Sequence, residues 1–398
     1  MNKNQNSKPI NKDLTASFDS IVSITKGSQQ MLTDLDGNMY LSFYTNSLLW
    51  SCGYNNPTIN RDVNKAIKKC QDENKPIDIN ALLSETSKKL HPHLSKKIPS
   101  IHYDSDSLYP KILSALLTKR NKTEFLCLEK KPGYFPKLFE DKIFSFKDWI
   151  GDDPKANTDA IENTVFPELK TIRFILRKHK STLAGCIIDP FLASDASLAK
   201  KEKLVPVLNL LSKYNIPIIW DESIAGFHRM GPVFSYKIYD AQPNVLIYDG
   251  LLYNDRSIHF AAVSKPIKKL LLNQELLVKP QDIPNFVMFN ALQNFIDTSD
   301  FTKKTQALGT RMIGKLRALE ANSGKKFTIK GKGLTLFINF KTEKLCDGFI
   351  TFMRTKGILV KKFDARPEFV LIYPPLILTE KNIDEIVENF KKFFNQPA

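Results

Sequence analysis

Side chains that could carry chemistry are few in this sequence and mostly stand alone. His91 and His93 flank a proline and are of the type that ligates metals, but no third ligand accompanies them, so we expect them on a surface or in a loop and predict no metal site. The five cysteines are scattered and form no CxxC pair, which excludes a disulfide framework and indicates a reducing compartment. Cys127 and Cys186 lie inside apolar segments, so we expect them in the core.

Short apolar segments alternate with helical patterns through the middle of the chain. The predicted strands are Glu124–Leu128, Leu183–Ile188, Ile216–Trp220, Asn244–Tyr248 and Ile258–Val263. The third of these is followed directly by Asp221. The predicted helices between and around them are Thr58–Cys70, Ile79–His91, Pro110–Lys119, Phe166–Lys180, Ala199–Tyr214 and a helical stretch from Asn285 to Glu320. Strands without polar alternation, separated by helices, predict a parallel sheet covered on both faces.

The two ends of the chain have different patterns. Met31–Phe43 alternates around Asp36-Gly37, which predicts a hairpin, and the segment after Phe327 alternates strands and helices. We therefore expect a polar tail at 1–24, a hairpin segment at 25–49 that packs with the C-terminal part, a large α/β domain at 50–285, and a small α+β domain with its linking helix at 286–398.

Composition limits the class of protein. Apolar residues make up 42% and charged residues 25% of the 398, which excludes a disordered chain, and no apolar run approaches the ~20 residues of a membrane span. The net charge is +16, and only 10 of the 58 cationic residues are arginine. The charge is consistent with a solvated lysine surface or with contact to RNA or another polyanion. The first twelve residues hold three lysines and no acid, which fits either a disordered tail or, in part, a mitochondrial targeting segment.

Several motifs together point to a family. Ile218–Gly250 has a strand ending in Asp-Glu, then Gly-Phe and Arg-x-Gly, then a proline before another strand, and it resembles the signature stretch of the class III aminotransferases, the ornithine/acetylornithine group. LTDLDGNMYLSF, CGYNNPTI, CIIDP, IKGKGLTLFINF and VLIYPPLIL resemble further segments of that family, so the resemblance covers about residues 25–395. It implies fold-type I of the pyridoxal-phosphate (PLP) enzymes, with a mostly parallel central sheet in the large domain and a small α+β domain.

The chemistry of this family needs a lysine that forms a Schiff base with PLP and an acid that holds the pyridinium nitrogen protonated. It also needs a phosphate turn at a helix N-terminus with a threonine from the partner subunit, an aromatic ring that stacks on the pyridine, and an arginine for the substrate carboxylate. By the resemblance, the acid is Asp221. The lysine position is Gly250, and the glycine of the phosphate turn is Asp106, whose carboxylate we expect to face the phosphate.

The remaining positions also differ from the family pattern. The stacking aromatic falls near Lys131, the phosphate threonine on Phe286 and the carboxylate-binding arginine on Leu371, with Arg366 five positions away. We therefore predict that the chain is not an enzyme, has no catalytic residue, and binds neither PLP nor any other cofactor, so that Asp221, Gly250, Asp106, Phe286 and Leu371 are vestigial positions.

Three functions stay open at this point. The first is a catalytically inactive aminotransferase homologue that is a structural or regulatory subunit of a larger assembly, possibly mitochondrial, paired with itself or with an aminotransferase paralogue, with RNA contact as one option. The second is a PLP-dependent aminotransferase with a displaced lysine. The third is a metabolite-binding protein that uses the cleft around Gly250, where Tyr248, Tyr253 and His259 either line a pocket or simply fill it.

Overall fold

The computed structural model describes residues 23–45, 47–72, 76–129, 137–146, 148–149, 168–193, 195–253, 256–272, 276–324 and 326–395. The predictions for the N-terminal tail up to residue 22 and for Lys131 fall outside these residues. The helices are α2 (Leu48–Ser51), α3 (Pro57–Asp72), α4 (Ile79–Leu90), α5 (Tyr109–Arg120), α7 (Leu169–His179), α8 (Lys201–Lys213), α9 (Lys265–Leu271), α10 (Ile283–Asp297), α11 (Phe301–Asn322), α12 (Glu343–Thr355) and α13 (Glu380–Phe394).

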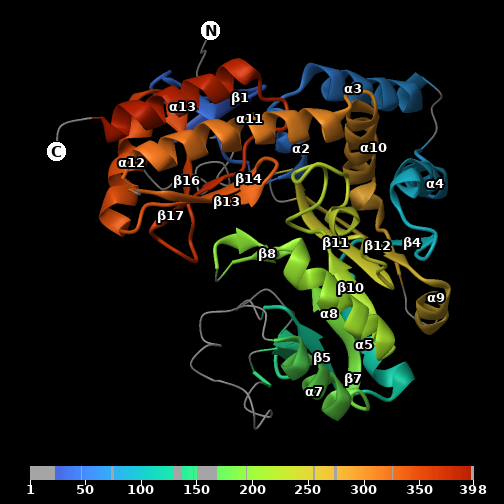
Figure 1. Cartoon of the computed structure of the whole chain (residues 1–398). Coiled ribbons are helices and arrows are strands. Elements are labelled where there is room, and N and C mark those ends of the chain that lie inside the picture. Colours follow the sequence, from blue (N-terminus) through green and yellow to red (C-terminus); the bar gives the residue numbers. More distant parts are fainter. Residues whose placement is uncertain are drawn as a thin grey trace.

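A seven-stranded sheet forms the centre of the molecule (Figure 1). Its strand order is β4 (Ser100–Asp104), β12 (Arg256–Val263), β11 (Val245–Tyr253), β10 (Ile218–Asp221), β7 (Leu183–Ile188), β5 (Glu124–Cys127) and β6 (Ile143–Ser145). The five strands from β11 to β6 run parallel, and β12 is antiparallel to both of its neighbours. The sequence-based prediction of a mostly parallel sheet is thus confirmed.

Alternation along the strands sends side chains into two cores. Ile219, Val245 and Ile247 pack with α5 and α9 on one face, and Ile218, Trp220 and Leu246 pack with α7 and α8 on the other. Both faces are covered, which is why these strands lack polar alternation. Cys127 and Cys186 lie in these cores as expected, and burial raises the pKa of the Cys186 thiol well above its usual value.

Two further sheets join the ends of the chain. β1 (Ile24–Ser28), β2 (Met31–Asp34) and β3 (Met39–Ser42) form the predicted N-terminal hairpin region, and β15 (Ile358–Leu359) pairs with β3 in parallel. The second sheet contains β13 (Thr328–Lys332), β14 (Thr335–Asn339), β17 (Phe369–Ile372) and β16 (Lys361–Lys362), and α11, α12 and α13 lie beside it (Figure 1). A small hairpin, β8 (Phe191–Leu192) with β9 (Ser197–Leu198), reaches from the central sheet toward β13.

Two elements differ from the sequence-based prediction. The helical stretch from Asn285 to Glu320 is two helices, because Asp300 adopts a left-handed conformation (φ 44°) between α10 and α11. The short strands β4 and β6 were not predicted, since β4 is a polar edge strand and β6 has only three residues. No helix among the described residues is long and apolar enough to cross a membrane.

Candidate functional site

The carboxyl ends of β10 and β11 and the start of α5 meet at one edge of the central sheet. Asp221, the last residue of β10, is fully buried, and the Tyr109 hydroxyl at the start of α5 donates a hydrogen bond to its Oδ2. The Ser223 amide donates to Oδ1 at 2.8 Å. Asp221 could be identified from the sequence. Its contact with Tyr109 was not predicted, although a tyrosine just before Pro110 at a predicted helix start was a usable signal.

A second polar group lies beside this pair. The Asp249 carboxylate accepts a hydrogen bond from the Ser107 hydroxyl, and the His259 Nδ1 lies 3.1 Å from its other oxygen. The antiparallel register of β11 and β12 brings Asp249 and His259 opposite each other. We call Asp221, Tyr109, Ser107, Asp249 and His259 the carboxyl-edge cluster.

Gly250 has no room for a side chain in this structure. A Cβ placed there would overlap the phenol ring of Tyr248, at 2.6 Å from its Cε1. The Tyr248 ring is 4% exposed and stacks on Phe260 at 5.3 Å, and burial raises the pKa of its hydroxyl. Tyr248 therefore fills the space where a side chain at position 250 would begin, while Tyr253 packs edge-on against Trp50 at 5.8 Å, away from it.

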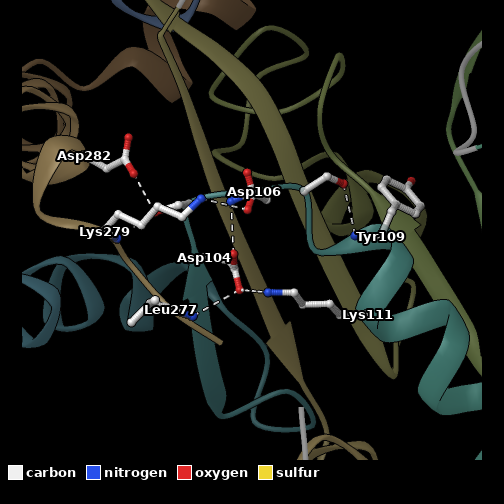
Figure 2. Close-up of polar contacts among 9 residues, drawn as sticks. Asp104, Asp106, Tyr109, Lys111, Leu277, Lys279 and Asp282 are labelled. Carbon is white, nitrogen blue, oxygen red and sulfur yellow. Dashed lines mark hydrogen bonds and ion pairs between the residues drawn. The ribbon is translucent and has the colours of Figure 1, made fainter. Parts of the chain in front are cut away.

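Side chains near the turn before α5 form hydrogen bonds with its backbone amides (Figure 2). The Asp104 Oδ1 accepts the Asp106 amide at 3.0 Å, and Asp104 Oδ2 accepts the Lys111 ammonium at 2.5 Å and the Leu277 amide at 3.2 Å. The Ser107 hydroxyl accepts a hydrogen bond from the Tyr109 amide at 3.2 Å. Two amides of this helix start, those of Asp106 and Tyr109, thus already have side-chain acceptors.

The outer side of the same turn holds Asp106. Its carboxylate is 70% exposed and lies 3.3 Å from the Lys279 ammonium (Figure 2). The prediction that this carboxylate faces the helix start is therefore wrong. Ser105 donates to Asp282 at 2.5 Å and accepts the Lys279 amide at 2.7 Å. The side chain that faces the helix start is that of Asp104, which sequence reasoning missed.

The other predicted positions lie apart from this edge. Phe286 on α10 is 2% exposed and meets Tyr103 edge-on at 5.5 Å, and Leu371 on β17 is buried among Phe191, Phe337 and Phe363. The guanidinium of Arg366, five positions before Leu371 in the sequence, is paired with Glu368 at 2.5 Å.

The next residues are the two histidines that were considered as metal ligands. His91 and His93 form a single 3-10 turn after α4, and the His93 Nε2 lies 3.4 Å from Asp297. In the part of the chain that the structure describes, no group of three or more His, Cys, Asp or Glu residues is arranged to hold a metal ion.

A network of polar contacts surrounds Arg229, in the Gly-Phe and Arg-x-Gly segment after β10. The guanidinium is 2% exposed, donates to the Pro374 carbonyl and to the hydroxyls of Thr45 and Ser51, the last at 2.9 Å, and lies 3.9 Å over the Tyr373 ring. We call this group the Arg229 junction, because it joins the segment before α2 to the segment after β17.

Two titratable groups near these sites have strongly shifted pKa values. Burial raises the pKa of Glu222 to about 8, partly offset by hydrogen bonds from the Ser235 and Tyr236 amides. Burial lowers the pKa of His228 to about 4, although the hydrogen bond between its ring and the Gly231 carbonyl acts to raise the pKa.

The fit of PLP to this chain follows from these contacts. The acid for the pyridinium nitrogen is present at Asp221, but Tyr109 is bonded to it. Position 250 has no amine, its space is filled by Tyr248, and two amides of the phosphate turn, those of Asp106 and Tyr109, are bonded to side chains. The chain thus does not provide, at position 250, the lysine that PLP chemistry requires.

Comparison with known proteins gives the family. The model of the class III aminotransferase family matches residues 137–394. The adenosylmethionine-8-amino-7-oxononanoate aminotransferase of Staphylococcus aureus is 26% identical over 93% of this chain and 91% of its own length, and the ornithine aminotransferase of Plasmodium chabaudi chabaudi is 24% identical over 54% and 53%.

Solved structures agree on the fold. A phospholyase from Arthrobacter in complex with phosphoethanolamine superposes with a TM-score of 0.76 at 15% identity, over 94% of this chain and 95% of that one. The acetylornithine aminotransferase of Elizabethkingia anophelis gives a TM-score of 0.73 at 16% identity, over 94% of both chains.

These matches overturn two of the sequence-based predictions. The prediction that the chain is not an enzyme is wrong, because the family and the relatives named above are enzymes. The prediction that no cofactor is involved is wrong for the same reason, since the family and these neighbours depend on PLP. With a family model that spans residues 137–394 and a fold shared with solved aminotransferases, this chain belongs to the class III aminotransferase family.

Proposed function

We propose that this chain is one subunit of a PLP-dependent aminotransferase assembly in which the cofactor-binding lysine belongs to a partner subunit. This chain then has a structural or regulatory part in the assembly. The observation that carries the proposal is the packing of Tyr248 over Gly250, which leaves no place for a lysine at this position in the chain itself.

The family supports an assembly of this kind. Class III aminotransferases are typically homodimers, so a chain of this fold is expected to pair through the same surfaces. A pair made of this chain and a paralogue with a lysine keeps the enzyme activity and the cofactor of the family. It also allows this chain to retain the fold while its own carboxyl-edge cluster is closed by internal hydrogen bonds.

Isolation from the native source in mild salt tests the proposal. The sample is treated with PLP and borohydride, and modified lysines are mapped by mass spectrometry in every chain that co-purifies. We expect a reduced lysine adduct on a co-purifying class III aminotransferase chain and none on this one. We also expect transaminase activity in the mixed assembly, and dilution with excess recombinant chain should change that activity.

Two outcomes would refute the proposal. A reduced adduct on a lysine of this chain would make it a PLP enzyme with a displaced lysine, and Lys111 and Lys279 are the ones to examine first because they lie at the phosphate turn. The variants Lys111→Met and Lys279→Met would then identify which amine carries it. A chain that co-purifies with no lysine-bearing aminotransferase would exclude the paired assembly.

A further inference from the structure

A hollow of about 660 Å³ opens away from the carboxyl-edge cluster. It lies between the start of α8, the β8–β9 hairpin, β13 and α11, and Figure 1 shows β8 between α8 and the β13–β14 sheet. None of the five residues of the carboxyl-edge cluster lines it. Its lining residues are Leu192, Asp195, Ser197, Leu198, Ala199, Lys200, Lys201, Glu202, Lys203, Met230, Ile238, Tyr239, Arg317, Ile329, Lys330, Gly331 and Lys332.

The rim of this hollow carries an excess of positive charge from three separate segments. Six lining side chains are cationic and two are carboxylates. Lys201 pairs with Asp240 at 2.6 Å and Lys330 with Asp195 at 3.1 Å. The other four cations have no ion pair among the described residues, and they are Lys200, Lys203, Arg317 and Lys332.

The start of α8 adds to this potential. Lys200 is the N-cap residue and provides no side-chain cap, and Lys201, Glu202 and Lys203 follow in the first turn, so that cations outnumber the one carboxylate. Cations at this end of a helix oppose the partial positive charge of the free amides, where anions are favoured. A bound anion would neutralise both the amides and the lysines.

The floor of the hollow is apolar. Met230, Ile238 and Tyr239 form it together with leucines from the β8–β9 hairpin, and the Tyr239 hydroxyl is held by the Ala199 carbonyl at 2.7 Å. The volume lies within the ~300–1,000 Å³ typical of small-molecule sites, and a cationic rim over an apolar floor suits a ligand with an anionic and an apolar part.

We propose that this hollow binds an organic polyphosphate such as a nucleoside triphosphate. The phosphates lie against Lys200, Lys203, Arg317 and Lys332, and the planar part lies on the floor near Met230 and Tyr239. The site is separate from the aminotransferase site and does not depend on the proposed function.

Calorimetric titration of the full chain tests this site with two probes, ATP and inorganic tripolyphosphate, in magnesium-free buffer. The test variant is Lys200→Gln/Lys203→Gln, and the matched control is Lys268→Gln/Lys269→Gln on α9, which removes the same charge from an exposed helix away from the hollow. We expect ATP to bind and the test variant to weaken it by roughly tenfold or more, because charge-assisted contacts to phosphate are lost. The control is expected to bind as the unchanged chain does.

The two probes separate the sources of affinity. Tighter binding of ATP than of tripolyphosphate supports the proposal. Equal binding of the two probes would overturn the placement of the planar part on the apolar floor. Absence of binding by both probes, or an equal loss in the control variant, would overturn the proposal. Binding of single-stranded RNA that the test variant abolishes, without binding of either small probe, would also overturn it in favour of a nucleic-acid surface.

Discussion

The carboxyl-edge cluster and the Arg229 junction both bring polar side chains together, but they differ in charge. Both join residues that are far apart along the chain. Tyr109 and Asp221 are 112 residues apart, Ser107 and Asp249 are 142 apart, and the hydrogen bonds of Arg229 span 145 to 184 residues. Among the described residues, each acceptor of the Arg229 guanidinium is a neutral oxygen. The junction is therefore a stabilising tie between distant segments, whereas the cluster contains two carboxylates, those of Asp221 and Asp249.

Breaking the junction should have the largest effect on stability. Arg229→Met leaves the Pro374 carbonyl and the Thr45 and Ser51 hydroxyls buried without a donor, so we expect a loss of about 3–5 kcal/mol in the free energy of unfolding, measured by denaturant titration. Arg317→Met, an exposed arginine on α11, is the matched control and should change stability by less than about 0.5 kcal/mol. Equal effects of the two variants would refute the role of the junction.

The pH dependence tests the buried histidine next to the junction. The pKa of His228 is about 4 when folded and near 6.5 when unfolded, so the unfolded state binds the proton first as the pH falls. Stability from this group is present above pH 6.5 and is lost as the pH falls toward 4, by about 3 kcal/mol at most. The charged neighbours His93, Asp297 and Asp300 act on the same group.

His228→Asn isolates that contribution, because asparagine tolerates the left-handed backbone (φ 65°) at this position. Unfolding curves between pH 4 and 7 should be flatter for this variant than for the unchanged chain. His91→Asn, at an exposed position, should leave the slope as it is. A variant slope equal to that of the unchanged chain would mean that His228 does not titrate in this range.

Gly250→Ala tests the packing that underlies the proposed function. The new methyl group overlaps the buried Tyr248 ring, so we expect a loss of about 1–3 kcal/mol. Gly314→Ala on α11 is a glycine-to-alanine control with nothing within 4 Å, and it should gain about 0.5–1 kcal/mol. Combining Gly250→Ala with Tyr248→Ala should cost less than the sum of the two single changes, and strict additivity would argue against the overlap.

The smallest effect is expected at the exposed side of the phosphate turn. Lys279→Met removes a partly exposed pair with Asp106 and should change stability by less than about 1 kcal/mol in denaturant titration. Lys111→Met is the contrasting variant, because its partner Asp104 is only 2% exposed, and about 1–3 kcal/mol is expected. A larger loss for Lys279 than for Lys111 would reverse the assignment of which side chain holds the turn.

Much of the fold could be predicted from the sequence. Apolar strands alternating with helices predicted the central sheet, because both faces of such a sheet are buried and the signal is local. The glycine and aspartate at Asp36-Gly37 predicted the hairpin, and the site prediction located Asp221 at a strand end. The helix break at Asp300 was missed, since a single left-handed residue leaves no periodic pattern.

The partners at the site were decided by tertiary structure alone. Tyr109 reaches Asp221 from 112 residues away, Asp249 meets His259 only through the register of β11 and β12, and Tyr248 fills the space above Gly250. The function class also needed the comparisons, because side-chain losses at single positions suggested an inactive protein while the family as a whole consists of enzymes. The sequence by itself determined the elements, since each depends on neighbouring residues. Contacts between distant segments decide which side chains meet at the carboxyl edge, at the Arg229 junction and at the hollow beside α8. Local periodicity does not encode such contacts.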